Sequence, residues 1–103
     1  MSLRAILDGA AADLPGVLVA AAPDGAMTWS VGGQAFAALS AEGSSAEFAL
    51  DPRVAAAAAR TPDVDLSPRG LGWVLFGPST LDDHAADRAT AWFASAHRRL
   101  TRG

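Results

Sequence analysis

Near the end of the chain, Asp83, His84 and Asp87 form the one cluster whose residue types suit metal binding or acid–base catalysis. On a helix the two aspartates share a face, whereas His84 points about 100° away from them. A transition-metal site needs at least three converging ligands, and the other histidine, His97, is too distant along the same helix to join them. We therefore interpret the cluster as an acidic, solvated first turn, where negative charge suits the positive end of the helix dipole.

The other groups that catalysis would need are few. The chain has no cysteine or tyrosine, and its eight basic residues are all arginine, so thiol and lysine nucleophiles are excluded. Asp63 and Asp65 would point the same way from an extended segment, where an acidic pair is more often solvated than catalytic. Gly70 and Gly72 precede an apolar run instead of opening a helix, which excludes a nucleotide-binding loop. We predict a protein that is not an enzyme, with no catalytic residue, no metal and no cofactor.

Four arginines are candidate contacts for the phosphates of nucleic acid. Arg98, Arg99 and Arg102 cluster at the end of the chain, and Arg69 lies on a predicted loop. Phosphate contacts of this kind would give an affinity that falls with salt. The alternative is that the three clustered arginines balance the negative end of a helix dipole. The formal net charge of −3 favours this alternative, because the overall field does not attract nucleic acid.

Four aromatic residues are predicted to anchor the core: Trp29, Phe36, Trp73 and Trp92. An exposed set of such rings could instead stack on the bases of a single strand. The tryptophans all lie on the apolar faces of their predicted elements, and large aromatic side chains bury much area when they pack. Core packing is therefore the favoured interpretation.

Composition limits the class of protein. The 103 residues predict a single domain over residues 1–103. The absence of cysteine fits a reducing compartment, so we expect a cytoplasmic protein. No apolar run approaches the roughly 18–20 residues of a membrane span, and the first residues lack the pattern of a signal peptide. Hydrophobic residues make up 50% of the chain, which favours a protein partner, of unknown identity, or self-association.

A β-hairpin is the clearest local prediction. The alternating run 27–31 is separated from the run 34–39 by the glycine pair 32–33, and two glycines accept the left-handed backbone of a tight turn. Counting outward from this turn places Trp29 opposite Phe36, as a cross-strand aromatic pair that would set the register.

The remaining patterns complete the fold class. Apolar spacing and turn residues predict helices over 3–13, over 52–60 and from 81 to the end, and strands over 27–31, 34–39, 46–50, 63–66 and 71–76. Residues 17–22 are either a short strand or an extended lead-in. The order of helix, three strands, helix, two strands and helix, α-β(3)-α-β(2)-α, predicts an α+β fold. It has two layers, with helices on one side of an antiparallel sheet.

Details of these elements are also predicted. Asp51 is expected to cap the second helix, and Thr80 the third, with Asp83 completing a capping box. The nearly continuous apolar run 71–76 predicts a central strand buried on both faces, and the charged segment 63–66 predicts an edge strand.

Four segments, in order and with matching spacing, resemble the MmcQ/YjbR family of small bacterial domains. They are Leu-Pro-Gly-Val at 14–17, Trp-Ser-Val-Gly-Gly-Gln-Ala-Phe-Ala at 29–37, Arg-Gly-Leu-Gly-Trp-Val-Leu at 69–75, and Ala-Trp followed by Ala-His-Arg-Arg-Leu within 91–100. The resemblance covers nearly the whole chain and implies the same helix and strand order, shared with type III secretion chaperones. The chain departs from the family pattern at Gln34, where the family has lysine. It departs again at Ser67, Pro68 and Leu71, in a loop where the family often has histidine and tyrosine.

The resemblance implies two functions. The likeness to secretion chaperones, which act as dimers, favours a non-catalytic protein-binding or adaptor module. The alternative is a weak DNA- or RNA-binding protein, as family members are often labelled, and it would use the arginines. A continuous positive face joining Arg69 to Arg98 and Arg99 would support nucleic acid, and an exposed apolar patch above ~600 Å² would support a protein partner.

Overall fold

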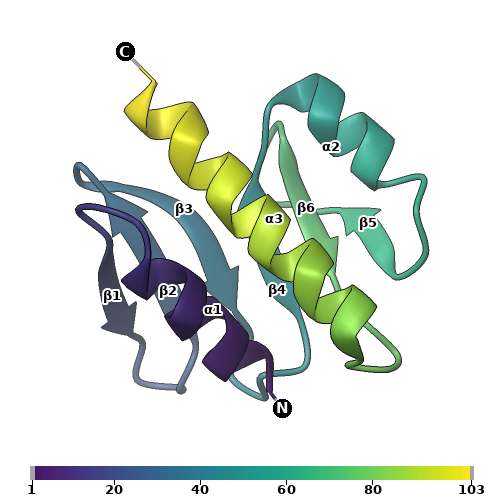
Figure 1. Ribbon diagram of the computed structural model, residues 1–103, viewed down its shortest axis with the longest axis horizontal. Coiled ribbons are helices and arrows are strands. Elements are labelled where there is room, and N and C mark those ends of the chain that lie inside the picture. Colours follow the sequence, from purple (N-terminus) through teal and green to yellow (C-terminus); the bar gives the residue numbers. More distant parts are fainter. Residues whose placement is uncertain (1, 103) are drawn as a thin grey trace.

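The computed structural model describes residues 2–102, in which three helices cover one face of a six-stranded sheet (Figure 1). The helices are α1 (Leu3–Ala12), α2 (Pro52–Ala58) and α3 (Asp83–Thr101). The strands are β1 (Leu18–Ala21), β2 (Met27–Val31), β3 (Gln34–Leu39), β4 (Ala46–Ala49), β5 (Val64–Leu66) and β6 (Trp73–Phe76). The predicted two-layer α+β class, with an antiparallel sheet, is confirmed.

The sheet has the strand order β1-β2-β3-β4-β6-β5, and all neighbours are antiparallel. The apolar segment whose conformation the sequence left open is strand β1, which pairs with β2 and forms one edge. Four strands, not three, therefore lie between α1 and α2. The prediction of an edge strand at 63–66 is confirmed, because β5 forms the opposite edge. No helix within residues 2–102 is long and apolar enough to cross a membrane.

The hairpin is present, but the predicted pairing of Trp29 with Phe36 is wrong. Strands β2 and β3 contain a bulge, so Trp29 lies opposite Ala37 and Phe36 is the additional residue. Both aromatic side chains are fully buried. Each ring meets Phe93 of α3 edge-on, at centroid distances of 5.8 Å for Trp29 and 5.0 Å for Phe36. The bulge places a small side chain opposite the indole, and the two rings reach the same residue of α3 from neighbouring strands.

The core lies between the sheet and the helices. Its largest fully buried side chains are Trp29, Phe36, Phe48, Phe76, Phe93, Leu7, Leu50 and Val74. Trp92 is partly buried against this core, with its ring centroid 5.2 Å from that of Phe76 and 6.2 Å from that of Phe48. Alanines occupy much of the buried face of α3, which lets the helix approach the sheet closely.

Strand β6 corrects two predictions. Val74 and Phe76 are fully buried, but Trp73 and Leu75 are only half-buried on the opposite face of the sheet. The strand is not covered on both sides because all three helices lie on one face (Figure 1). Trp73, which the sequence placed among the core anchors, therefore lies on the open face and outside the core.

One of the two predicted helix caps is confirmed, and the other is wrong. Asp51 caps α2 as predicted, since its Oδ1 accepts a hydrogen bond of 2.9 Å from the backbone N–H of Arg53. Helix α3 is capped by Asp82 rather than Thr80, and its Oδ1 accepts from the N–H of Ala85 at 2.9 Å. Aspartate is at least as good a cap as threonine, so local sequence alone does not decide between these two positions.

Candidate functional site

A pocket of about 460 Å³ lies between the start of α2 and the C-terminal half of α3. We call it the arginine pocket, because its lining residues are Asp51, Val54, Ser95, Arg98, Arg99 and Arg102. Arg98 and Arg99 lie in the last turn of α3, and Arg102 is the C-cap residue that follows the helix. The structure thus brings three of the four arginines predicted to contact phosphate around one concavity.

The pocket carries an excess of positive charge. Within residues 2–102, none of its three arginines forms an ion pair, whereas Arg4 and Arg69 do. The only acidic residue in the lining is Asp51, whose Oδ1 is engaged in the cap of α2. Arg98 and Arg99 also occupy the last turn of α3, where cations offset the negative end of the helix dipole. Dipole balance accounts for part of their placement, but leaves the guanidinium groups open to an anion.

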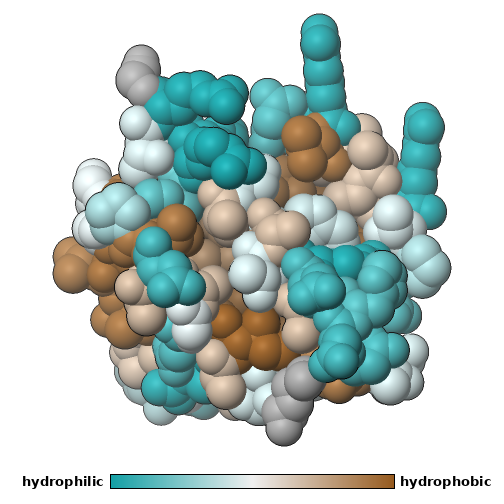
Figure 2. Space-filling view, in the orientation of Figure 1, coloured by the Kyte–Doolittle hydropathy of each residue, from teal (hydrophilic) through white to brown (hydrophobic). Residues whose placement is uncertain are grey.

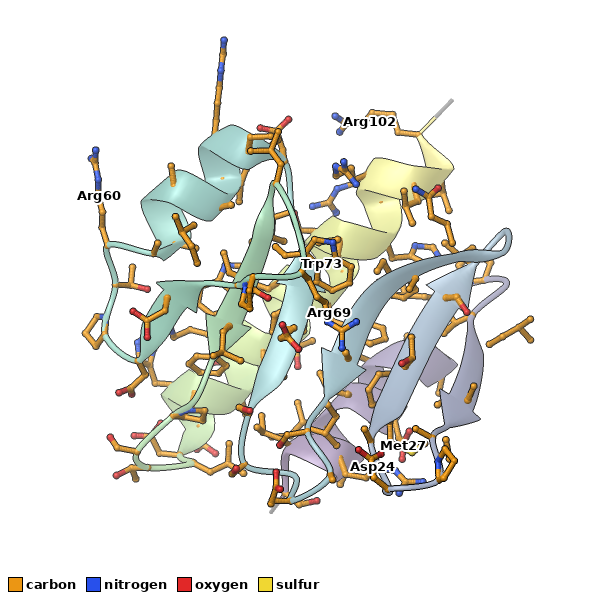
Figure 3. All side chains as sticks on the ribbon, turned by 180° about the vertical axis from the view of Figure 1, so that it is seen from behind. Asp24, Met27, Arg60, Arg69, Trp73 and Arg102 are labelled. Carbon is orange, nitrogen blue, oxygen red and sulfur yellow. The ribbon has the colours of Figure 1, made fainter. Side chains whose placement is uncertain are left out.

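Arg69 lies elsewhere. It belongs to the open face of the sheet, where its Nε donates to Oε1 of Glu47 at 3.0 Å and its guanidinium lies 5.3 Å from the centre of the Trp73 ring. Ser67 donates its hydroxyl to the same carboxylate and accepts the N–H of Arg69 at 3.1 Å. Figure 3 shows Arg69 and Trp73 together on the sheet, with Arg102 apart from them at the end of α3. The charge of Arg69 is therefore satisfied locally.

The acidic cluster around His84 does not assemble into one site. His84 lines a second cavity, of about 420 Å³, at the start of α3, together with Asp63 and Asp82. Asp83 and Asp87 are exposed and are not part of its lining. Across residues 2–102, no three histidine, aspartate or glutamate side chains are grouped so that they could hold a metal ion.

The second cavity also contains an arginine, Arg88, whose Nη2 group is already engaged within the protein. Arg88 donates from Nη2 to the Thr61 hydroxyl at 2.7 Å and to the Pro62 carbonyl at 2.9 Å. Its guanidinium lies over the rings of Phe76 and Trp92, at 4.9 and 5.0 Å. Arg88 therefore links α3 to the loop before β5. This cavity has fewer unpaired positive groups with which to bind an anion than the arginine pocket has.

His97 is a residue whose role the sequence did not reveal. It is only 4% exposed, and its Nε2–H donates to the carbonyl of Pro15 at 2.9 Å. Its ring meets Phe36 edge-on, with centroids 5.6 Å apart. His97 thus joins α3 to the loop between α1 and β1. The signal was its spacing of four residues from Phe93, which places it on the buried stripe of the helix.

The second candidate surface is the edge strand β1. All four of its residues are exposed, with Leu18 at 69% and Val19 at 51%. No charged residue occurs between Asp13 and Asp24, and Figure 2 shows hydrophobic residues gathered at this side of the molecule. The opposite edge, β5, carries Asp65. Natural sheets usually protect their edges with charge or proline, so β1 is the unprotected edge.

Comparison of the sequence with protein-family models gives no match, and comparison with curated proteins gives none either. Two surfaces stand out: the arginine pocket and the apolar edge β1.

Proposed function

We propose that the protein is a non-catalytic protein-binding module of the MmcQ/YjbR type, which pairs its β1 edge with an extended segment of a partner. The observation that carries this proposal is the exposed, uncharged and apolar edge strand. An edge strand presents unpaired backbone N–H and C=O groups, and an extended peptide satisfies them by adding a strand to the sheet. The family resemblance in four segments also supports an adaptor role.

The chemistry of β1 indicates the kind of segment that would bind. Alternate side chains of a strand point to opposite faces, so a peptide beside β1 meets Leu18 on one face and Val19 on the other. A partner with apolar residues on both faces would bury these two side chains. A segment with acidic or basic residues at these positions would lose hydration with no opposite charge to replace it. The expected partner is an uncharged, β-branched or otherwise apolar extended segment.

Lysine at both Leu18 and Val19 is expected to weaken peptide binding about tenfold or more, since each 1.4 kcal/mol of lost binding energy corresponds to tenfold in Kd. Peptides would be selected from a displayed library on the parent protein, and their Kd values measured by fluorescence anisotropy. Both positions are solvent-exposed, so circular dichroism should show that the double variant folds.

The matched control is Leu71→Lys, because Leu71 is 85% exposed and lies outside β1. The control should bind the selected peptides as tightly as the parent does. Sedimentation of the parent and the double variant would show whether a second copy occupies the edge. Selected peptides that bind the double variant unchanged would rule out β1 as the binding edge.

Binding of DNA or RNA is the second candidate function, supported by the three arginines of the arginine pocket. If these three contact phosphates, affinity for duplex DNA should fall roughly 40-fold between about 50 and 200 mM salt, because the logarithm of the binding constant falls by about 0.9 per contact with the logarithm of salt. Anisotropy of a labelled random duplex and of a single strand measures this. Absence of binding at about 50 mM salt would exclude this function.

A further inference from the structure

We infer that the arginine pocket binds a phosphomonoester, with its phosphate dianion held by Arg98, Arg99 and Arg102. This inference does not depend on the proposed binding at β1, because the pocket and strand β1 share no residue; it uses the same arginines as the second candidate function. Two kinds of molecule carry such a phosphomonoester: a small phosphorylated molecule with hydroxyl groups, and an oligonucleotide with a 5′-phosphate end.

The donors of the pocket match a phosphate group. Each guanidinium presents a planar fork of N–H donors that fits phosphate oxygens in pairs. Ser95 belongs to the same lining, and its hydroxyl would supply a neutral donor. Three arginines close together, two in the last turn of α3 and one at its C-cap, repel one another. A bound dianion would relieve a repulsion that no carboxylate in residues 2–102 relieves through an ion pair.

The shape of the pocket favours one phosphate group rather than the continuous backbone of a duplex. Its volume of about 460 Å³ is that of a small-ligand cleft. The start of α2 supplies the facing wall through Asp51 and Val54. The remaining candidate arginine, Arg69, is held on the open face of the sheet by Glu47 (Figure 3). The arginines thus form a local concavity and not a basic stripe.

The facing wall suggests what the phosphate is attached to. Val54 is 41% exposed and offers apolar surface to a carbon skeleton. Asp51 uses Oδ1 to cap α2, and its second carboxylate oxygen can accept a hydrogen bond from a ligand hydroxyl. A phosphorylated sugar would place its phosphate on the arginines and a hydroxyl on Asp51. A bare anion would face the carboxylate of Asp51 with no hydrogen-bond donor.

Titration calorimetry with ribose 5-phosphate, inorganic phosphate and ribose tests the inference. Ribose 5-phosphate should bind more tightly than inorganic phosphate, and ribose should give no signal. Each of Arg98→Gln, Arg99→Gln and Arg102→Gln should weaken ribose 5-phosphate binding about tenfold, the usual loss for a hydrogen bond between charged groups. Asp51→Asn should keep the helix cap and should bind inorganic phosphate severalfold more tightly, because it removes the facing negative charge.

Arg60→Gln is the matched control, since it changes the net charge equally and lies outside the pocket lining; Figure 3 shows Arg60 far from Arg102. Binding should be unchanged in this variant. A loss equal to that of Arg98→Gln, or no binding of either phosphate at millimolar concentration, would overturn the inference. A 5′-phosphorylated oligonucleotide compared with its unphosphorylated form distinguishes the sources, because only the former should bind if the site accepts a nucleic-acid end.

Discussion

Replacing Trp29 with alanine is expected to lower the free energy of unfolding by about 3–5 kcal/mol. The indole is fully buried and meets Phe93 edge-on, so its loss leaves a cavity between the sheet and α3. Neighbouring Phe36 packs on the same Phe93 ring, which limits collapse into that cavity. A domain of this size has only about 5–15 kcal/mol of stability in total, so the variant should be close to unfolding at 25 °C.

Trp29→Phe is the control for this change. The indole Nε1 is buried and has no hydrogen-bond partner, and burying an unpaired donor costs about 1–3 kcal/mol. Phenylalanine keeps a buried aromatic ring and removes that donor. Trp29→Phe should therefore lower the free energy of unfolding much less than Trp29→Ala does. Urea titration of both variants gives the comparison. A loss below about 1 kcal/mol for Trp29→Ala would show that the indole is not a core anchor.

Gly72→Ala is expected to cost roughly 3 kcal/mol or more, for two separate reasons. Gly72 has φ of +85°, a left-handed backbone that costs a residue with a Cβ roughly 1–2 kcal/mol. A Cβ at this position would also overlap the carbonyl oxygen of Leu50. That strand end cannot move freely, because the N–H of Leu50 donates to the carbonyl of Gly72 at 2.8 Å.

Gly43→Ala separates these two causes. Gly43 has a similar φ of +76°, but no atom lies within 4 Å of the position that a Cβ would occupy. It should therefore show only the backbone cost of roughly 1–2 kcal/mol. Thermal and urea unfolding of both variants measures the difference. Equal losses at the two glycines would contradict the close approach of residues 50 and 72.

The Gly72 contact also connects the fold to the arginine pocket. Leu50 directly precedes Asp51, which caps α2 and lines the pocket. Displacing the backbone at Leu50 would move this wall relative to α3. Phosphate binding by Gly72→Ala should therefore weaken even where the variant remains folded, whereas Gly43→Ala should bind as the parent protein does.

Much of the fold follows from local patterns in the sequence. Helical apolar spacing, the Gly-Gly turn and the Asp51 cap are signals within a few residues, and they predict the helices, the hairpin and the two-layer class correctly. The edge position of β5 is also predictable, because charge on a short strand marks an edge. These features depend on neighbours in the chain, so the sequence by itself determined them.

Other features depend on partners distant in sequence, and only the tertiary structure decided them. The bulge at Phe36 arises between the paired strands, and the Phe36 ring packs against Phe93 of α3. Trp73 is only half-buried because all three helices lie on the other face of the sheet. Segment 18–21 became a strand through its pairing with β2. Arg98, Arg99 and Arg102 are already close together in the sequence. Only the fold places the start of α2 beside them to form a pocket, and only the fold pairs Arg69 with Glu47 away from it. Local patterns set which elements form, but the arrangement of side chains at a surface depends on how those elements pack.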